Sequence, residues 1–237
     1  MTNLLTGNQK VGDIVASLPE AITVFKKYNI DFCCGGHKTL SEAVKQQGVE
    51  EKAVLTELSN LSTSSSERHV HLDWRTAPLT ELVNHIIDTH HTFIKKEFPI
   101  INELTEKIMS VHGSSHKELV RVDHLFRLLR KDLEAHLETE EKILFPLILE
   151  YDKSPSQQKF EKMLTVINEL ENEHELAGNI LKELRQITNQ YTAPPEGCTS
   201  YRMAYRKLEE MEDDIFRHIH LENNILHPRI AGLKLPV

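Results

Sequence analysis

One apolar stripe in the second half of the sequence is interrupted by polar residues at positions where a helix bundle needs apolar ones. Its members recur at alternating steps of four and three residues, which is the spacing of the inward face of a bundle helix. Burying an unpartnered polar group costs on the order of 1–3 kcal/mol, and a lone carboxylate costs more. The two polar members, a histidine and a glutamate, therefore need a partner inside the bundle. The stripe consists of Val122, Phe126, Leu129, Leu133, His136, Glu140, Ile143 and Leu147.

Three further segments carry similar stripes with the same kind of interruption. The last segment repeats the His-x-x-x-Glu pair as His218 and Glu222, and the third contributes His174. In the first segment His91 replaces an apolar residue, although its neighbour His90 fits the spacing nearly as well. One such histidine is usually a hydrogen-bonded core residue. Six polar residues on four facing helices, at heights that agree within about 6 Å, instead predict one polynuclear metal site.

The spacing of the breaks predicts the architecture. Breaks near residues 112–115, 152–155 and 193–197 divide the second part of the chain into four long helical segments. Short connections between long amphipathic helices give antiparallel neighbours. Because no useful β-strand alternation is present, we expect an all-α protein that contains an up-down-up-down four-helix bundle.

A change of composition predicts two domains. Residues 1–61 form a small helical domain, residues 62–77 a polar linker, and residues 78–237 the bundle. In the small domain, Thr39 and Glu42 fit a capping box that opens a helix. About 60 residues bury only a marginal core, so this domain is expected to lean on the bundle or on a second copy of itself.

Composition excludes several classes of protein. With 28 basic and 36 acidic residues the formal net charge is −8, which disfavours nucleic acid and anionic membranes as partners. No apolar run approaches the roughly 20 residues that span a bilayer, and no signal peptide is recognisable. Three cysteines do not make a secreted disulfide framework. We therefore expect a cytoplasmic protein with no nucleic-acid or membrane partner.

The ligand set predicts the metal. Four imidazoles and two carboxylates suit two metal ions, each with two histidines, because a carboxylate can bridge two ions and an imidazole cannot. Nitrogen and oxygen donors without cysteine favour iron or manganese over structural zinc or copper(I). Such a site leaves coordination positions for oxo, water or a small diatomic ligand.

Other polar residues near the stripes are expected to lie outside the site. Helical spacing turns His220 and His227 toward solvent, and it places Glu141 on the wrong side for a ligand. Glu171, on the flank of its stripe, is the candidate for a hydrogen bond to a ligand.

The run Asp31-Phe32-Cys33-Cys34-Gly35-Gly36 is the other unusual feature. Adjacent cysteines form at best a strained disulfide. Two readings stay open: a pair of small buried apolar residues, or thiols that bind a soft metal or exchange redox equivalents. Cys198, in a proline-rich loop, is expected to take no part in the chemistry.

These motifs together resemble one known family. FCCGG at 32–36, HLETEEKILFP at 136–146, EHELAG at 173–178 and HIHLENNIL at 218–226 are similar to the repair-of-iron-centres (ScdA/YtfE-like) proteins. The resemblance covers nearly the whole chain. It implies a haemerythrin-like domain with two non-haem irons, oxo- and carboxylate-bridged. It also resolves the first-helix ambiguity in favour of His91. The implied ligands are His91, His136, His174 and His218, with Glu140 and Glu222 as bridges.

The resemblance implies repair of iron–sulfur clusters damaged by nitrosative or oxidative stress. A homodimer that supplies iron to damaged or apo iron–sulfur proteins is the first hypothesis, with Cys33 and Cys34 as redox or iron-transfer candidates. This chain would then be a delivery protein more than an enzyme. Reduction of nitric oxide at the di-iron centre, or sensing of nitric oxide or oxygen there, is the alternative.

Overall fold

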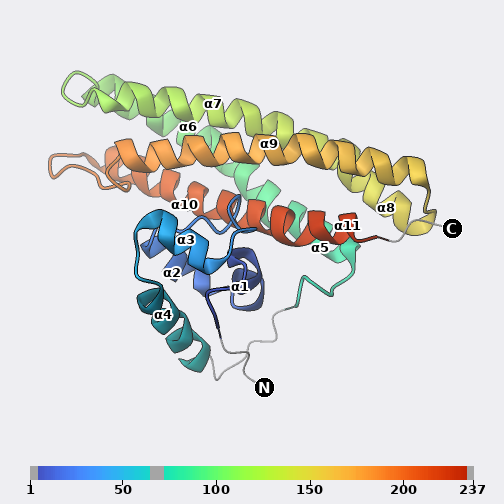
Figure 1. The fold of residues 1–237 in the computed structure, drawn as a ribbon. Coiled ribbons are helices and arrows are strands. Elements are labelled where there is room, and N and C mark those ends of the chain that lie inside the picture. The colour runs from blue at the N-terminus through green and yellow to red at the C-terminus, as the bar shows by residue number, and fades with distance from the viewer. Residues whose placement is uncertain (1–4, 65–71, 234–237) are drawn as a thin grey trace. The chain divides into compact units, whose positions relative to one another are not determined.

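The protein is built from helices. The computed structural model describes residues 5–64 and 72–233, and within these ranges it contains helices and turns but no strand. An isolated antiparallel bridge joins Lys10 to Thr39. The all-α prediction is confirmed (Figure 1).

The described residues divide into two compact units. The bundle unit comprises residues 83–218, and the N-terminal unit comprises residues 5–64 and 72–82 together with 219–233. The last helical run of the chain therefore begins in the bundle unit and ends in the N-terminal unit.

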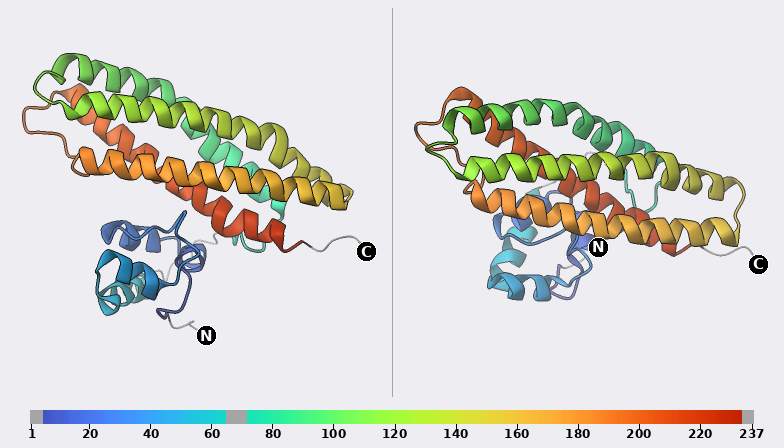
Figure 2. Two further views of the ribbon diagram at one scale, coloured as in Figure 1. Left: turned by 45° about the horizontal axis from the view of Figure 1, so that its top comes forward. Right: turned by 90° about the horizontal axis from the view of Figure 1, so that it is seen from above.

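Four long helical runs make up the bundle, and π-helical segments interrupt three of them. Figures 1 and 2 show α6, α7, α9 and α10 running alongside one another with short connections, as an up-down-up-down bundle requires. The predicted four-helix bundle is confirmed. The runs are α5 (Leu79–His85), η1 (Ile86–His91) and α6 (Thr92–His112); α7 (Glu118–Thr139), η2 (Glu140–Leu144) and α8 (Phe145–Lys153); α9 (Gln157–Ile187); and α10 (Thr199–Leu221), η3 (Glu222–Leu226) and α11 (His227–Ala231).

The predicted stripe of the second run holds up to Glu140 and then shifts by one residue. Its apolar members from Val122 to Leu133 are at most 3% exposed. Ile143, predicted to point inward, is 39% exposed, whereas Leu144 and Ile148 are buried. The physical reason is η2, because a π turn holds one residue more than an α turn and rotates the residues that follow.

The N-terminal unit contains four short helices and the end of the last run. Thr39 and Glu42 form the predicted capping box, and Gly48 ends the helix in the left-handed conformation with φ of 65°. α4 continues to Ser64, three residues into the predicted linker, whose residues 65–71 lie outside the described ranges. The helices are α1 (Val11–Ser17), α2 (Ala21–Lys27), α3 (Leu40–Gln47) and α4 (Glu51–Ser64).

This unit has a core of its own, and η3 is part of the unit. Phe25, Leu40 and Leu58 are fully buried, and α1 packs against η3. The helix α1 had not been predicted, because its seven residues are too few to show a helical period.

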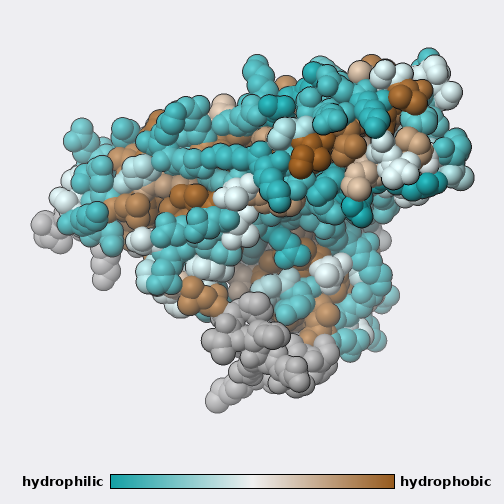
Figure 3. Space-filling model, turned by 180° about the vertical axis from the view of Figure 1, so that it is seen from behind, coloured by the Kyte–Doolittle hydropathy of each residue, from teal (hydrophilic) through white to brown (hydrophobic). Residues whose placement is uncertain are grey.

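The face of the molecule shown in Figure 3 is mainly hydrophilic. On the face shown in Figure 3, hydrophobic side chains form small scattered groups among hydrophilic ones. Among the described residues, no helix combines the length and apolar character needed to cross a membrane.

Candidate metal centre

Every π-helical segment in the described residues contains one of the six predicted site residues at its first or last position. His91 is the last residue of η1, Glu140 is the first of η2 and Glu222 is the first of η3. Short π segments inside α-helices are rare and recur at functional sites. The helices therefore depart from regular geometry where the stripes become polar.

The carboxylate of Glu140 lies at the centre of the cluster. Its Oε2 lies 3.3 Å from Nε2 of His91 and 3.8 Å from Nε2 of His218, whereas its Oε1 lies 3.4 Å from Nε2 of His136. Nε2 of His174 lies 3.0 Å from Nε2 of His136. These five side chains are at most 1% exposed. The two oxygens thus face different imidazoles, an arrangement that suits a carboxylate shared by two ions.

The six residues fall into two sets of possible metal ligands. Both sets contain Glu140 and Glu222, and the ligand atoms within each set lie within 4.8 Å of one another. The place of Glu222 follows from helix continuity, since it lies one turn beyond His218 and Leu221 between them keeps helical angles of φ −59° and ψ −34°. The first set adds His91 and His218, and the second adds His136 and His174.

The protonation pattern of the imidazoles fits a bound cation. Nδ1 of His91 lies 2.7 Å from Oε1 of Glu141, and Nδ1 of His136 lies 2.8 Å from Oε2 of Glu173. A carboxylate only accepts, so Nδ1 is the donor in each pair, and a neutral ring then directs the Nε2 lone pair into the cluster. Lone pairs that converge with a buried carboxylate repel one another unless a cation lies between them. The donor set therefore fits divalent metal ions.

His90 points to a different partner from His91. Its Nδ1 lies 2.9 Å from Oδ1 of Asp214, and its ring stacks on that of His218 at 5.7 Å between centroids. Neither ligand set includes His90. The geometry thus separates the two neighbours that the spacing alone had left open.

Comparisons with known proteins cover the same two parts of the chain. A family model described as a domain of unknown function (DUF542, ScdA_N) matches residues 7–62. The model of the hemerythrin HHE cation binding domain matches residues 82–230. The iron–sulfur cluster repair protein YtfE of Citrobacter koseri is 35% identical over 95% of this chain and 98% of its own length. The proteins of the same name from Shigella boydii and Escherichia coli are each 34% identical over the same shares.

The chain belongs to the YtfE family of iron–sulfur cluster repair proteins. The predicted resemblance is confirmed, because these relatives match almost the whole chain. Both parts of the family architecture, the ScdA_N domain and the HHE domain, are present in the expected order.

In this YtfE-family chain, the carboxylates that orient the histidines were missed by sequence reasoning. Glu141, predicted to lie on the wrong side, accepts from His91 and also binds Lys95 at 2.6 and 2.7 Å. Partial burial opposes ionisation of Glu141, but the hydrogen bonds from Lys95 and His91 outweigh it and lower its pKa. Glu171 is exposed, and the carboxylate that contacts His136 is that of Glu173. The sequence holds no local signal for either pair, because Glu141 lies 50 positions from His91 and Glu173 lies 37 positions from His136.

The prediction that His220 and His227 face solvent is wrong. They are 4% and 3% exposed. The ring of Phe32, in the loop between α2 and α3, lies 6.1 Å from that of His220 and covers this face of the run. The π segment η3 also changes the register between the two histidines, so seven residues no longer return to the same face.

Cys33 and Cys34 lie in the loop between α2 and α3, where Asn224 of η3 holds the backbone. Nδ2 of Asn224 donates to the carbonyls of Phe32 and Cys33 at 3.2 and 2.9 Å. Cys33 is buried and Cys34 is partly exposed. A hydrogen bond with Cys34, burial and the neighbouring Asp31 raise the pKa of the Cys33 thiol well above its usual value.

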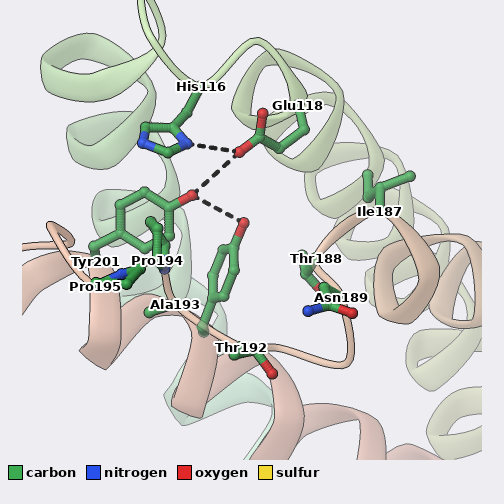
Figure 4. Close-up of a pocket in the computed structure, with 11 residues that line it drawn as sticks. His116, Glu118, Ile187, Thr188, Asn189, Thr192, Ala193, Pro194, Pro195 and Tyr201 are labelled. Atoms are coloured by element: carbon green, nitrogen blue, oxygen red, sulfur yellow. Dashed lines mark hydrogen bonds and ion pairs between the residues drawn. The ribbon is translucent and has the colours of Figure 1, made fainter.

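The far end of the bundle carries a separate hollow of about 280 Å³, drawn in Figure 4. The hydroxyl of Tyr201 lies 3.4 Å from Oε1 of Glu118 and 3.2 Å from the hydroxyl of Tyr205, and His116 also contacts Glu118. Tyr201 precedes His218 on α10 by a helical distance of about 25 Å at 1.5 Å per residue. These polar groups pair with one another and stand apart from the histidine cluster.

We expect Glu141→Gln to weaken divalent-metal binding by about 10- to 100-fold, because the amide no longer holds His91 as an Nδ1 donor with a charged acceptor. Metal affinity is measured by titration of metal-free protein with circular dichroism as the check on folding. Glu138→Gln is the matched control, since it removes an exposed carboxylate from the same helical run. Equal affinities of the two variants would contradict the orienting role.

Cys198 is expected to react with iodoacetamide as a thiol of unusually low pKa. Its Sγ lies 3.3 Å from Nε2 of His112, and this hydrogen bond, with backbone amides of Tyr201 and Ser200, lowers the pKa to about 7. The alkylation rate should reach half its maximum near that pH, and His112→Gln should move the midpoint upward. The rate is followed by mass spectrometry of the Cys198 peptide, with His124→Gln on an exposed position as control. A midpoint unmoved by His112→Gln would contradict the assignment.

Proposed function

We propose that this protein holds two iron ions in the bundle and supplies iron to iron–sulfur clusters damaged by nitrosative or oxidative stress. This proposal rests on the two buried sets of possible metal ligands, which share the carboxylates of Glu140 and Glu222. The names of the relatives, iron–sulfur cluster repair proteins, support repair over reduction or sensing of nitric oxide.

Each ligand has a distinct part in this proposal. One ion would be held by His91 and His218, the other would be held by His136 and His174, and the two would share Glu140, Glu222 and an oxo ligand. Bound iron would supply labile cations with open coordination positions. Four imidazoles and two carboxylates, all neutral or singly charged, hold such ions less permanently than a closed thiolate cage does.

Residues around the ligands keep the site ready for loading. Glu141 and Glu173 hold the rings of His91 and His136 so that Nε2 faces inward. Burial of the cluster excludes bulk water and strengthens the attraction between carboxylates and a cation. Lys95 balances the charge of Glu141 on the outer side.

The proposal also includes the compartment, the oligomeric state and the partners of the protein. We place it in the cytoplasm as a homodimer that meets damaged or apo iron–sulfur proteins. All three cysteines are free thiols, as expected in a reducing compartment. The homodimer rests on the family resemblance.

The double variant Glu140→Gln with Glu222→Gln is expected to lose both irons and all repair activity, because an amide cannot bridge two cations as a carboxylate does. Iron is measured per chain with the electron paramagnetic resonance spectrum, and repair as reactivation of a purified iron–sulfur enzyme inactivated by nitric oxide. Glu138→Gln with Glu171→Gln, both at exposed positions, is the control. If iron-loaded wild-type protein did not reactivate the enzyme under conditions in which free iron does, the proposal would be wrong.

Replacing both Cys33 and Cys34 by alanine is expected to leave the two irons of the bundle in place and to abolish repair, since the bundle ligands stay intact while the transfer thiols are gone. The electron paramagnetic resonance signal of the bundle iron and the reactivation are measured on the same preparation. Cys198→Ala removes a thiol elsewhere and should keep both properties. Full repair by the double variant would exclude a transfer role for the pair.

A further inference from the structure

Three metal-binding side chains of the N-terminal unit converge outside the bundle site. Ligand atoms of Asp31, Cys33 and Cys34 all lie within 4.8 Å of one another. Sγ of Cys33 lies 3.3 Å from Oδ1 of Asp31 and 3.8 Å from Sγ of Cys34. One carboxylate and two thiols thus face a common point in the loop between α2 and α3.

The spacing of these atoms suits a tetrahedral metal ion. Two thiolates at about 2.3 Å from a tetrahedral ion lie about 3.8 Å apart, and a carboxylate oxygen at about 2.1 Å lies about 3.6 Å from either sulfur. The observed separations are 3.8 Å between the sulfurs and 3.3 Å between Cys33 Sγ and Asp31 Oδ1. A disulfide would need about 2.05 Å between the sulfurs and strained geometry for adjacent cysteines.

The loop is held in this conformation by contacts that do not involve the sulfurs. Oδ1 of Asp31 accepts from the backbone amides of Cys33 and Gly35 at 3.2 and 3.0 Å. Asn224 binds the carbonyls on the other side, and the amide of Gly12 donates to the carbonyl of Gly36 at 2.9 Å. The three ligands are therefore preorganised, which reduces the entropy lost on binding an ion.

Cys34 is more exposed than Cys33, and this difference gives a metal ion a route into the site. Cys33 is 3% exposed, whereas Cys34 is partly exposed. An ion can meet the thiol of Cys34 first and then the buried pair of Cys33 and Asp31. Three protein ligands leave the fourth tetrahedral position open, as in sites that exchange a ligand and unlike closed structural sites.

We propose that Asp31, Cys33 and Cys34 bind one thiophilic divalent transition-metal ion, with ferrous iron as the cargo class. Both thiol protons leave to solvent when the ion binds, and no electron is transferred. The proposal goes beyond iron storage in the bundle and does not depend on it, because a different set of donor atoms holds the ion. It gives the adjacent cysteines a defined chemistry and adds Asp31 to it.

The test is an anaerobic titration of metal-free, full-length protein with cobalt(II), read in the near-ultraviolet. Thiolate ligands give an intense sulfur-to-cobalt charge-transfer band, and nitrogen and oxygen ligands give none. The band is expected in wild type, in Glu140→Gln with Glu222→Gln and in Cys198→Ser. It is expected to be lost in Cys33→Ser with Cys34→Ser. The bundle variant separates this proposal from the repair proposal, because it removes the bundle bridges and leaves the loop intact.

Asp31→Asn tests the third ligand without unfolding the loop, because the amide oxygen still accepts from the two backbone amides. Cobalt binding should weaken by at least about tenfold, the scale on which groups that support a metal site act. Absence of the band in wild type, or a band that disappears with Cys198→Ser alone, would overturn the site. Unchanged affinity in Asp31→Asn would overturn the role of the carboxylate.

Discussion

The burial of one carboxylate constrains most of this structure. Glu140 is fully buried, and nitrogens of three imidazoles lie within 3.8 Å of its oxygens. Removing an ion from water costs several kcal/mol even after the protein relaxes, and lone pairs directed at it add to that cost. A divalent cation reverses the sign, since every inward atom then becomes a ligand. The polar layer of the bundle therefore has the donor set of a metal site.

The sequence predicted those features of the fold and the site that depend on residues close together in the chain. The stripe from Val122 to Glu140 predicted an inward face, and the six interruptions predicted a polar cluster, because both follow from regular helix geometry. The capping box of Thr39 and Glu42 is equally local and was also confirmed. The orienting role of Glu141 was missed, since its partner His91 lies fifty positions away in the sequence.

The wrong predictions of which side Ile143 and His227 face have one physical origin. The π segments η2 and η3 each add a residue to a turn, so a period read from the preceding turns fails beyond them. Ile143 therefore lies outside, and His227 lies inside. His220 was misjudged for another reason, because a single helix pattern cannot reveal that Phe32 covers its outer side.

Two residues of η3, two positions apart, have different roles. Glu222, its first residue, faces the polar layer, and Asn224 binds the carbonyls that shape the cysteine loop. Residues two apart on a helix point in nearly opposite directions, so one turn can serve both. Gly36 is needed at this contact, because a Cβ there would collide with the amide of Asn224. The two donor sets differ in kind, because one combines buried imidazoles and carboxylates, whereas the other combines one carboxylate with two thiols, one of them partly exposed. One helical segment therefore contributes to both donor sets, because it supplies Glu222 to one and holds the backbone of the other through Asn224.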